Sequence, residues 1–257
     1  MLYYKTFTNN LSNDWIVLIH GAGGSCEVWH RQVSDFARRY NLLLVDLVGH
    51  GGSANIPFGN NFSFVKAADQ VMEVVNHLKI KSFHIMGISL GTIIVRIIGD
   101  RYAEQVKSMV LAGAVTELSL RMRLVLKMAN LTKHILPYET TKRMMVNLIV
   151  PKKKHEYSRN LYFHNSKKVP FDCFLKWLKL GDKFNSKIRE LFHEKIAKPT
   201  LYLMGEDDYL FLAKAQEALS SNGDMASLTI VPDAGHVCNV DNKKFFNEHT
   251  LAFIANY

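Results

Sequence analysis

Short apolar runs alternate with stretches of helical spacing along the first part of the chain. Four of them contain four or five residues each, mostly Ile, Val, Leu or Phe: Trp15–Ile19, Leu42–Val45, Phe83–Met86 and Ser108–Leu111. Runs of this kind are typical of strands that are buried on both faces of a parallel sheet. From Phe64 to Leu78, apolar residues recur every three or four positions, which indicates one face of a helix. The alternation predicts an α/β fold with a doubly wound, mostly parallel sheet and right-handed crossovers.

The alternation is interrupted in the middle of the chain. Residues 117–195 have helical spacing and are rich in Met and Leu, and strand-like runs return only at Thr200–Met204 and Leu228–Val231. Helices of this amphipathic kind pack over another surface and do not connect parallel strands. The expected parts are an α/β core of residues 1–115 and 199–257 and a helical cap of residues 116–198 within the same domain.

Composition limits what else the chain can be. Its 257 residues are 48% hydrophobic and 21% charged, as in a globular domain with one sizeable core. The N-terminus lacks the pattern of a signal peptide, and the most apolar run, Ile85–Gly99, is too short to span a bilayer. We therefore expect a cytoplasmic protein without a membrane span. The three cysteines are widely spaced and the histidines are scattered, so we expect no disulfide framework, no metal and no cofactor.

Charge is distributed unevenly. The net charge is +9, and residues 116–198 alone carry 19 Lys and Arg against 7 Asp and Glu. A solvated, Lys-rich face explains this excess, and a docking surface for an acidic partner is the alternative. The basic segment lacks a recognisable nucleic-acid-reading motif, so no nucleic-acid partner is expected.

The segment Gly87-Ile88-Ser89-Leu90-Gly91 matches the pattern Gly-x-Ser-x-Gly. It directly follows the apolar run Phe83–Met86 and directly precedes a helical pattern. A serine on such a sharp strand-to-helix turn projects its hydroxyl above the sheet, and the crowded backbone requires small residues two positions before and after it. The pattern predicts that Ser89 is a catalytic nucleophile.

A second glycine-rich turn, His20-Gly21-Ala22-Gly23-Gly24, follows the first buried run. A dinucleotide-binding turn would need a third glycine at the position of Cys26. The preferred interpretation is an oxyanion loop, in which a backbone N–H faces the reaction centre beside the N–H of the residue after the nucleophile. We expect these two amides to be those of Ala22 and Leu90.

Two further strand ends carry the expected acid and base. Gly205-Glu206-Asp207-Asp208 follows one strand-like run, and Asp233-Ala234-Gly235-His236 follows the last. Because the carboxyl ends of parallel strands lie at one edge of a sheet, these side chains should lie level with Ser89. The order Ser, Asp, His is that of a triad on this kind of sheet. Asp207, Asp208 and Asp233 are all candidates for the acid, and His236 is the candidate base.

Together these segments resemble the α/β-hydrolase superfamily, and in particular its short, cap-bearing bacterial-type serine hydrolases. The matching motifs are His20-Gly21, the turn at Ser89, Gly205-x-x-Asp208, Gly235-His236 and Asp46-Leu47-Val48-Gly49-His50-Gly51-Gly52-Ser53. The resemblance implies a catalytic triad of Ser89, Asp208 and His236, because the superfamily's acid lies three residues after the glycine. It also implies a structural role for Asp46. Serine at position 89 argues against haloalkane dehalogenases, which have aspartate there.

The expected activity is hydrolysis of carboxylic esters through an acyl-enzyme. The Met- and Leu-rich cap favours a mainly apolar acyl group. Alternatives within the superfamily are hydrolysis of a small-molecule lactone and an acyl-carrier-protein methyl esterase that uses the basic cap to bind its acidic carrier. A ligand-binding receptor with little turnover is the alternative of another class.

Overall fold

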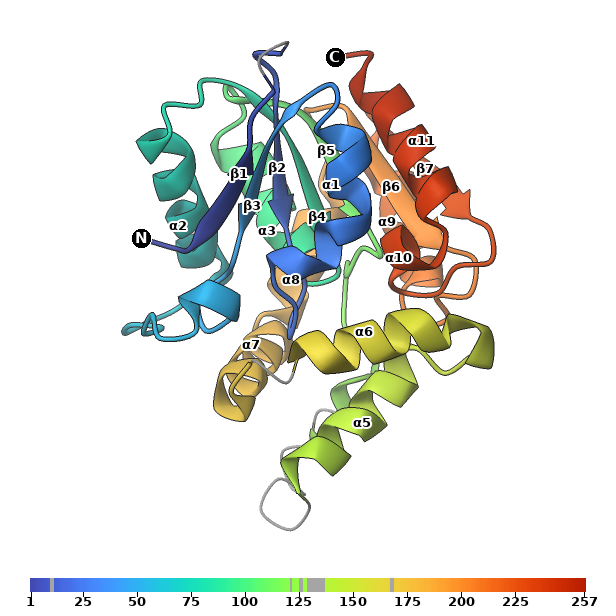
Figure 1. Ribbon diagram of the computed structural model, residues 1–257. Helices are drawn as coiled ribbons and strands as arrows, with labels where there is room; N and C mark the ends of the chain where they lie inside the picture. Colours follow the sequence, from blue (N-terminus) through green and yellow to red (C-terminus); the bar gives the residue numbers. More distant parts are fainter. Residues whose placement is uncertain (10–11, 121, 125–126, 129–136, 167–168) are drawn as a thin grey trace.

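The computed structural model describes residues 1–257 except 10–11, 121, 125–126, 129–136 and 167–168. Its centre is a sheet of seven strands in the order β1-β3-β2-β4-β5-β6-β7 (Figure 1). The strands are β1 (Tyr4–Phe7), β2 (Trp15–Ile19), β3 (Asn41–Val45), β4 (Phe83–Ile88), β5 (Val106–Ala112), β6 (Thr200–Gly205) and β7 (Ala226–Val231). Only β1 runs antiparallel to its neighbour, β3. The predicted doubly wound, mostly parallel sheet is therefore confirmed.

Alternate side chains of the central strands supply two separate apolar cores. In β2, Val17 and Ile19 pack in the core that contains α2 (Phe64–His77), α3 (Gly91–Arg101) and part of α9 (Leu212–Asn222). Ile16 and Leu18 face the opposite core, with α1 (His30–Phe36), α10 (Cys238–Asp241) and α11 (Lys243–Ile254). A strand that is apolar at every position is thus explained by burial on both faces.

The chain between β5 and β6 is helical where the structure describes it. Its helices are α5 (Tyr138–Ile149), α6 (Glu156–Ser166), α7 (Phe171–Lys183) and α8 (Asn185–His193), and a 3-10 turn (Lys153–His155) precedes α6. Figure 1 shows α5, α6 and α7 gathered at one end of the sheet. Part of the predicted cap lies outside the described residues.

Helix α8 differs from the other three in its position. It packs against α3 and α9, in the helical layer of the sheet, and its Ile188 and Phe192 belong to the same core as α2 and α3. The division into core and cap stays a prediction. The contacts of α8 favour a boundary near Phe184, earlier than the expected residue 198.

Within the described residues, no helix combines the length and the apolar character that crossing a membrane would need. Cys26, Cys173 and Cys238 are all free thiols.

Candidate active site

Ser89 lies on a strained turn between β4 and α3. Its φ of 53° is in the left-handed region, which non-glycine residues rarely adopt, and its N–H donates to the carbonyl of Ala112 at 2.9 Å. A Cβ on Gly87 would lie 2.6 Å from the backbone of Gly91, and one on Gly91 would lie 2.6 Å from the carbonyl oxygen of Ile19. The two glycines of the motif are therefore required by close backbone contacts.

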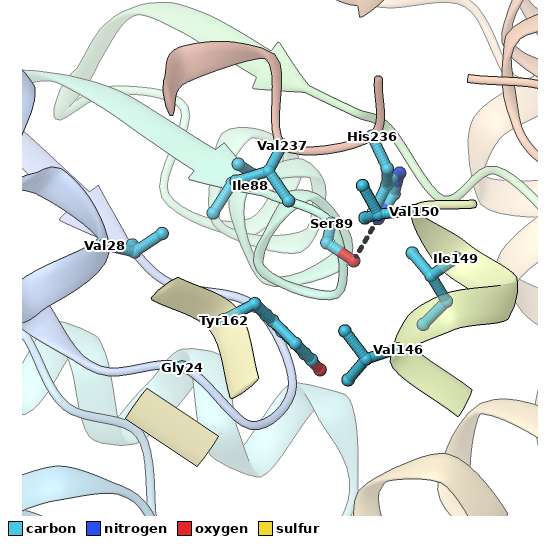
Figure 2. A pocket seen from close by; sticks show the side chains of 11 residues that line it. Gly24, Val28, Ile88, Ser89, Val146, Ile149, Val150, Tyr162, His236 and Val237 are labelled. Atoms are coloured by element: carbon cyan, nitrogen blue, oxygen red, sulfur yellow. Dashed lines mark hydrogen bonds between the residues drawn. The ribbon is translucent and has the colours of Figure 1, made fainter. Parts of the chain in front are cut away.

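The carboxyl ends of β4, β6 and β7 bring the three predicted side chains together. Ser89 Oγ lies 2.9 Å from His236 Nε2, and His236 Nδ1 lies 2.8 Å from Asp208 Oδ2. Figure 2 shows the first of these contacts as a dashed line. Asp208 and His236 are 1% and 5% exposed, so water does not compete for their hydrogen bond.

This geometry determines the direction of each hydrogen bond. The Asp208 carboxylate can only accept a hydrogen bond, so His236 Nδ1 carries the imidazole proton and donates it. Nε2 is then left to accept from the Ser89 hydroxyl. The Phe211 ring lies beside the imidazole, with ring centroids 4.8 Å apart. The arrangement can transfer a proton from the serine and stabilise the charge that forms on the imidazole.

The other two candidate acids lie elsewhere. Asp207 accepts hydrogen bonds from Lys152, Lys154 and His155. The hydrogen bonds from Lys152 and Lys154 hold the pKa of Asp207 well below its usual range. Asp233 is exposed and pairs with Lys154 at 3.0 Å. Of the three carboxylates, only that of Asp208 contacts His236.

Buried histidines hold the loop that contains Ala22. His20 Nε2 accepts from the N–H of Leu47 at 2.9 Å, so its Nδ1 carries the proton and donates to the carbonyl of Gly21 at 2.7 Å. The Gly21 carbonyl and the Ala22 N–H belong to one trans peptide group and point in opposite directions. The hydrogen bond from His20 therefore fixes the direction of the Ala22 N–H.

The next peptide group is held at both ends. The Tyr162 hydroxyl donates to the carbonyl of Ala22 at 2.5 Å, and the N–H of Gly23 donates to His50 Nε2 at 2.9 Å. Burial lowers the pKa of His50 to about 3 and also lowers the pKa of His20. Both rings are therefore neutral near pH 7, so His20 can accept from the N–H of Leu47 and His50 from the N–H of Gly23.

The amides of Ala22 and Leu90 are available to a ligand. Neither N–H donates a hydrogen bond to another atom in the described part of the chain. Both residues border the larger of two cavities that meet at Ser89. Their role as an oxyanion hole stays a prediction.

Asp46, for which the resemblance implies a structural role, forms hydrogen bonds within the protein. Its carboxylate is buried and accepts from the N–H groups of Cys26 at 2.6 Å and Gly52 at 2.8 Å. The same loop is fixed by the Ser53 hydroxyl, which donates to the Asp46 carbonyl at 2.8 Å. These contacts give Asp46 a structural role. The described residues also include no cluster of three or more His, Cys, Asp or Glu side chains that could hold a metal ion.

Two apolar cavities meet at Ser89, His236 and Tyr162. The smaller, of about 470 Å³, is drawn in Figure 2 and is lined by Gly21, Gly24, Val28, Ile88, Ser89, Val146, Ile149, Val150, Tyr162, His236 and Val237. The larger, of about 630 Å³, shares Ser89, Ile149, Tyr162 and His236 with the smaller one. The rest of its lining is Ala22, Phe64, Leu90, Ile93, Val115, Leu118, Met122, Met145, Phe174, Trp177, Leu178, Gly181, Ile188 and Phe211. No Lys, Arg, Asp or Glu belongs to the described lining of either cavity.

Several of these residues are absent from the predicted site. Tyr162 on α6 contacts the loop of Ala22, and Val146 and Ile149 on α5 face Ser89. All three come from the helical segment, whose position over the sheet depends on contacts between distant parts of the chain. The spacing within the segment indicates an apolar helix face, but it does not indicate which residues reach the serine.

Comparison with known proteins supports the same fold. The sequence model of the family described as alpha/beta hydrolase fold matches residues 14–138. The 2-succinyl-6-hydroxy-2,4-cyclohexadiene-1-carboxylate synthase of Shigella flexneri serotype 5b is 33% identical over 91 residues, which are 35% of this chain and 34% of the synthase. The match therefore spans about a third of the length of that relative.

Two solved structures agree with this chain over nearly their whole length. The enol-lactonase from Burkholderia xenovorans LB400 has a TM-score of 0.84 at 18% identity and covers 99% of this chain and 96% of its own. The esterase from Exiguobacterium antarcticum has a TM-score of 0.84 at 18% identity, with 99% and 95% covered. At such identities the agreement concerns the fold.

Proposed function

We propose that this chain, which belongs to the α/β-hydrolase superfamily, is a serine hydrolase that cleaves carboxylic esters through an acyl-enzyme on Ser89. The observation that carries the proposal is the hydrogen-bonded series Ser89, His236, Asp208 at the point where two apolar cavities meet. A ligand-binding protein could use the same apolar cavities. It would not need a serine that is hydrogen-bonded to a buried His–Asp pair.

The reaction follows from the directions of the hydrogen bonds. Ser89 Oγ attacks the ester carbonyl carbon while His236 Nε2 takes its proton, and Asp208 stabilises the resulting imidazolium. The N–H groups of Ala22 and Leu90 bind the oxyanion, and each such donor is worth about 3 kcal/mol. The C–O bond then breaks, and His236 protonates the departing alcohol. Water repeats the cycle and releases the acid and free Ser89.

The cavities favour an ester that is apolar on both sides of the carbonyl. The larger cavity contains Ala22 and Leu90 and is bordered by aromatic and aliphatic side chains, which suits the acyl group. The smaller cavity, bordered by Val28 and Val146, suits the alcohol. The described lining of neither cavity contains a Lys or Arg side chain, which suits an uncharged ester.

The lactonase, carrier-protein esterase and receptor alternatives differ in their product, their partner and their turnover. A lactone needs the same triad and is distinguished by its products. An acidic carrier protein would dock on basic side chains, but Lys152 and Lys154 are already paired with Asp207. A carrier-protein partner stays a prediction. The cytoplasmic location is a separate prediction from the sequence. A receptor with little turnover would bind apolar ligands in the same cavities and leave Ser89 unreactive.

A panel of p-nitrophenyl esters with acyl chains of two to twelve carbons, with matching lactones and thioesters, tests the proposal. We expect turnover that rises from acetate to a longer acyl chain, and a loss of at least about 1,000-fold in kcat/KM in Ser89→Ala. The matched control is Ser227→Ala, which changes an exposed serine on β7, away from the carboxyl ends of the strands. Turnover retained in Ser89→Ala, or apolar ligand binding without any turnover in the wild type, would refute the proposal.

A further inference from the structure

His155 is a buried histidine outside the triad whose two ring nitrogens both face carboxylates. Its side chain is 2% exposed, Nε2 lies 3.0 Å from Asp207 Oδ2, and Nδ1 lies 3.2 Å from Asp241 Oδ2. A neutral imidazole has one N–H and could donate to only one of them. A protonated ring, or a proton on one of the carboxylates, satisfies both contacts.

Each of these carboxylates is linked to a loop that carries a triad residue, Asp207 by sequence and Asp241, at the end of α10, by a hydrogen bond. Asp207 immediately precedes Asp208, and its N–H donates to the carbonyl of Ala234 at 2.8 Å. The Asp241 carboxylate accepts from the N–H of Gly235, the residue before His236, at 2.8 Å. The loop that carries Asp208 and the loop that carries His236 are thus both linked to His155.

The His155 ring also contacts the loop that carries His236 directly. A Cβ on Gly235 would lie 3.1 Å from His155 Cδ2, so the imidazole packs against the backbone beside His236. His155 itself ends the 3-10 turn before α6, and its carbonyl accepts from the Ser158 hydroxyl at 3.0 Å. The same helix α6 carries Tyr162, which contacts the loop of Ala22.

We propose that His155 is a positioning residue that sets the relative placement of Asp208 and His236 from the helical segment over the site. The inference rests on the proposed function, because it assigns a task to His155 within that reaction. His155 does not touch the reacting atoms. It acts through Asp207 and Asp241, which hold the backbone on either side of the Asp208–His236 hydrogen bond.

Two amide substitutions separate the two contacts. An Asn amide nitrogen sits near the place of Nδ1, so His155→Asn keeps a donor for Asp241 and loses the one for Asp207. A Gln amide nitrogen sits near the place of Nε2, so His155→Gln keeps a donor for Asp207 and loses the one for Asp241. His155→Leu removes both donors. The matched control is His164→Leu, which makes the same change at an exposed histidine of α6.

The kinetic test uses the p-nitrophenyl ester that the wild type turns over fastest, at a temperature at which circular dichroism shows each variant folded. We expect kcat to fall about tenfold in His155→Leu with KM within about twofold, and the acidic limb of the kcat/KM pH profile to move because the His236–Asp208 contact changes. His155→Asn and His155→Gln should each recover part of kcat. His164→Leu should match the wild type.

A lower melting temperature with unchanged kcat, KM and pH profile in all three variants at position 155 would overturn the proposal and leave His155 a structural contact only. If His155→Leu does not fold, unchanged kcat, KM and pH profile in His155→Asn and His155→Gln would overturn the proposal in the same way. The NMR shift of the His236 Nδ1 proton gives a readout that needs no substrate. A wild type without turnover refutes the proposed function, whereas a His236 resonance that is the same in wild type and variants refutes the positioning role.

Discussion

Single residues around Ser89 fall into those that react and those that fix backbone groups nearby. His20, His50 and Tyr162 belong to the second kind, since they bond to the Gly21 carbonyl, the Gly23 N–H and the Ala22 carbonyl respectively. The peptide groups on both sides of Ala22 are therefore held before any substrate arrives. Preorganised donors of this kind cost no reorganisation during the reaction.

Replacing Tyr162 by phenylalanine tests this preorganisation. The change removes the hydroxyl that donates to the Ala22 carbonyl and keeps the ring in the cavity wall. One lost hydrogen bond of about 1 kcal/mol should lower kcat about fivefold on the preferred ester with little change in KM. Tyr157→Phe, at an exposed tyrosine of the same helix, is the control. A change in KM alone would mean that Tyr162 acts only as a wall of the cavity.

The lowered pKa of His50 predicts that the stability of the protein depends on pH. Its folded pKa of about 3 lies below the unfolded value near 6.5, so between these pH values only the unfolded chain binds a proton there. The free energy of unfolding should therefore fall as pH falls through this window. In His50→Gln the slope should be shallower by up to about 1.4 kcal/mol per pH unit, measured by urea denaturation from pH 6.5 to 4. Equal slopes would contradict a neutral His50.

The sequence predicts the reactive residues of the site better than their supports. Ser89, Asp208 and His236 each follow a strand-like run, and parallel strands end at one edge, so their meeting could be expected. Their catalytic roles stay predictions. His155 and Tyr162 gave no local signal, because their task depends on where α6 lies over the sheet.

At the scale of elements, the connection from β4 to α3 is constrained by close backbone contacts. Gly91 packs against the carbonyl oxygens of Ile19 and His20, where an added Cβ would lie 2.6 and 2.7 Å away. Both contacts are with backbone, which cannot rotate aside as a side chain can. The start of α3 and the end of β2 are therefore fixed to each other at the serine.

The substitution Gly91→Ala should destabilise the protein by roughly 3 kcal/mol, because either β2 or α3 must move. Gly181→Ala is the matched control, since a Cβ there meets only Leu118 Cδ1 at 3.4 Å and lies within α7. That control should gain up to about 1 kcal/mol from helix propensity. Chemical denaturation of both variants measures the difference, and similar stabilities would contradict the close contact.

Helix α8 shows what spacing alone does not predict. Its apolar residues recur like those of the other helices after β5, yet it covers the sheet with α3 and α9. Amphipathic spacing indicates that a helix has a buried face, and long-range packing decides which surface buries it. Strand β1 is a similar case, because its direction against β3 has no signal within its four residues.

At the scale of the whole molecule, the uneven charge is partly used inside the protein. Two lysines of the basic segment, Lys152 and Lys154, bind Asp207, and Lys154 also binds Asp233. A basic excess in the sequence therefore overstates the positive charge left to attract an acidic partner. The mostly parallel sheet, by contrast, was predictable, because runs buried on both faces have few other arrangements.

The reaction of Ser89 with a fluorophosphonate, followed by intact-protein mass spectrometry and peptide mapping, measures whether Ser89 is an activated nucleophile. We expect one adduct per chain on Ser89 in the wild type, much slower labelling in His236→Ala and Asp208→Asn, and none at that position in Ser89→Ala. A folded wild type in which Ser89 stays unmodified, or in which the adduct lies on another residue, would contradict this expectation.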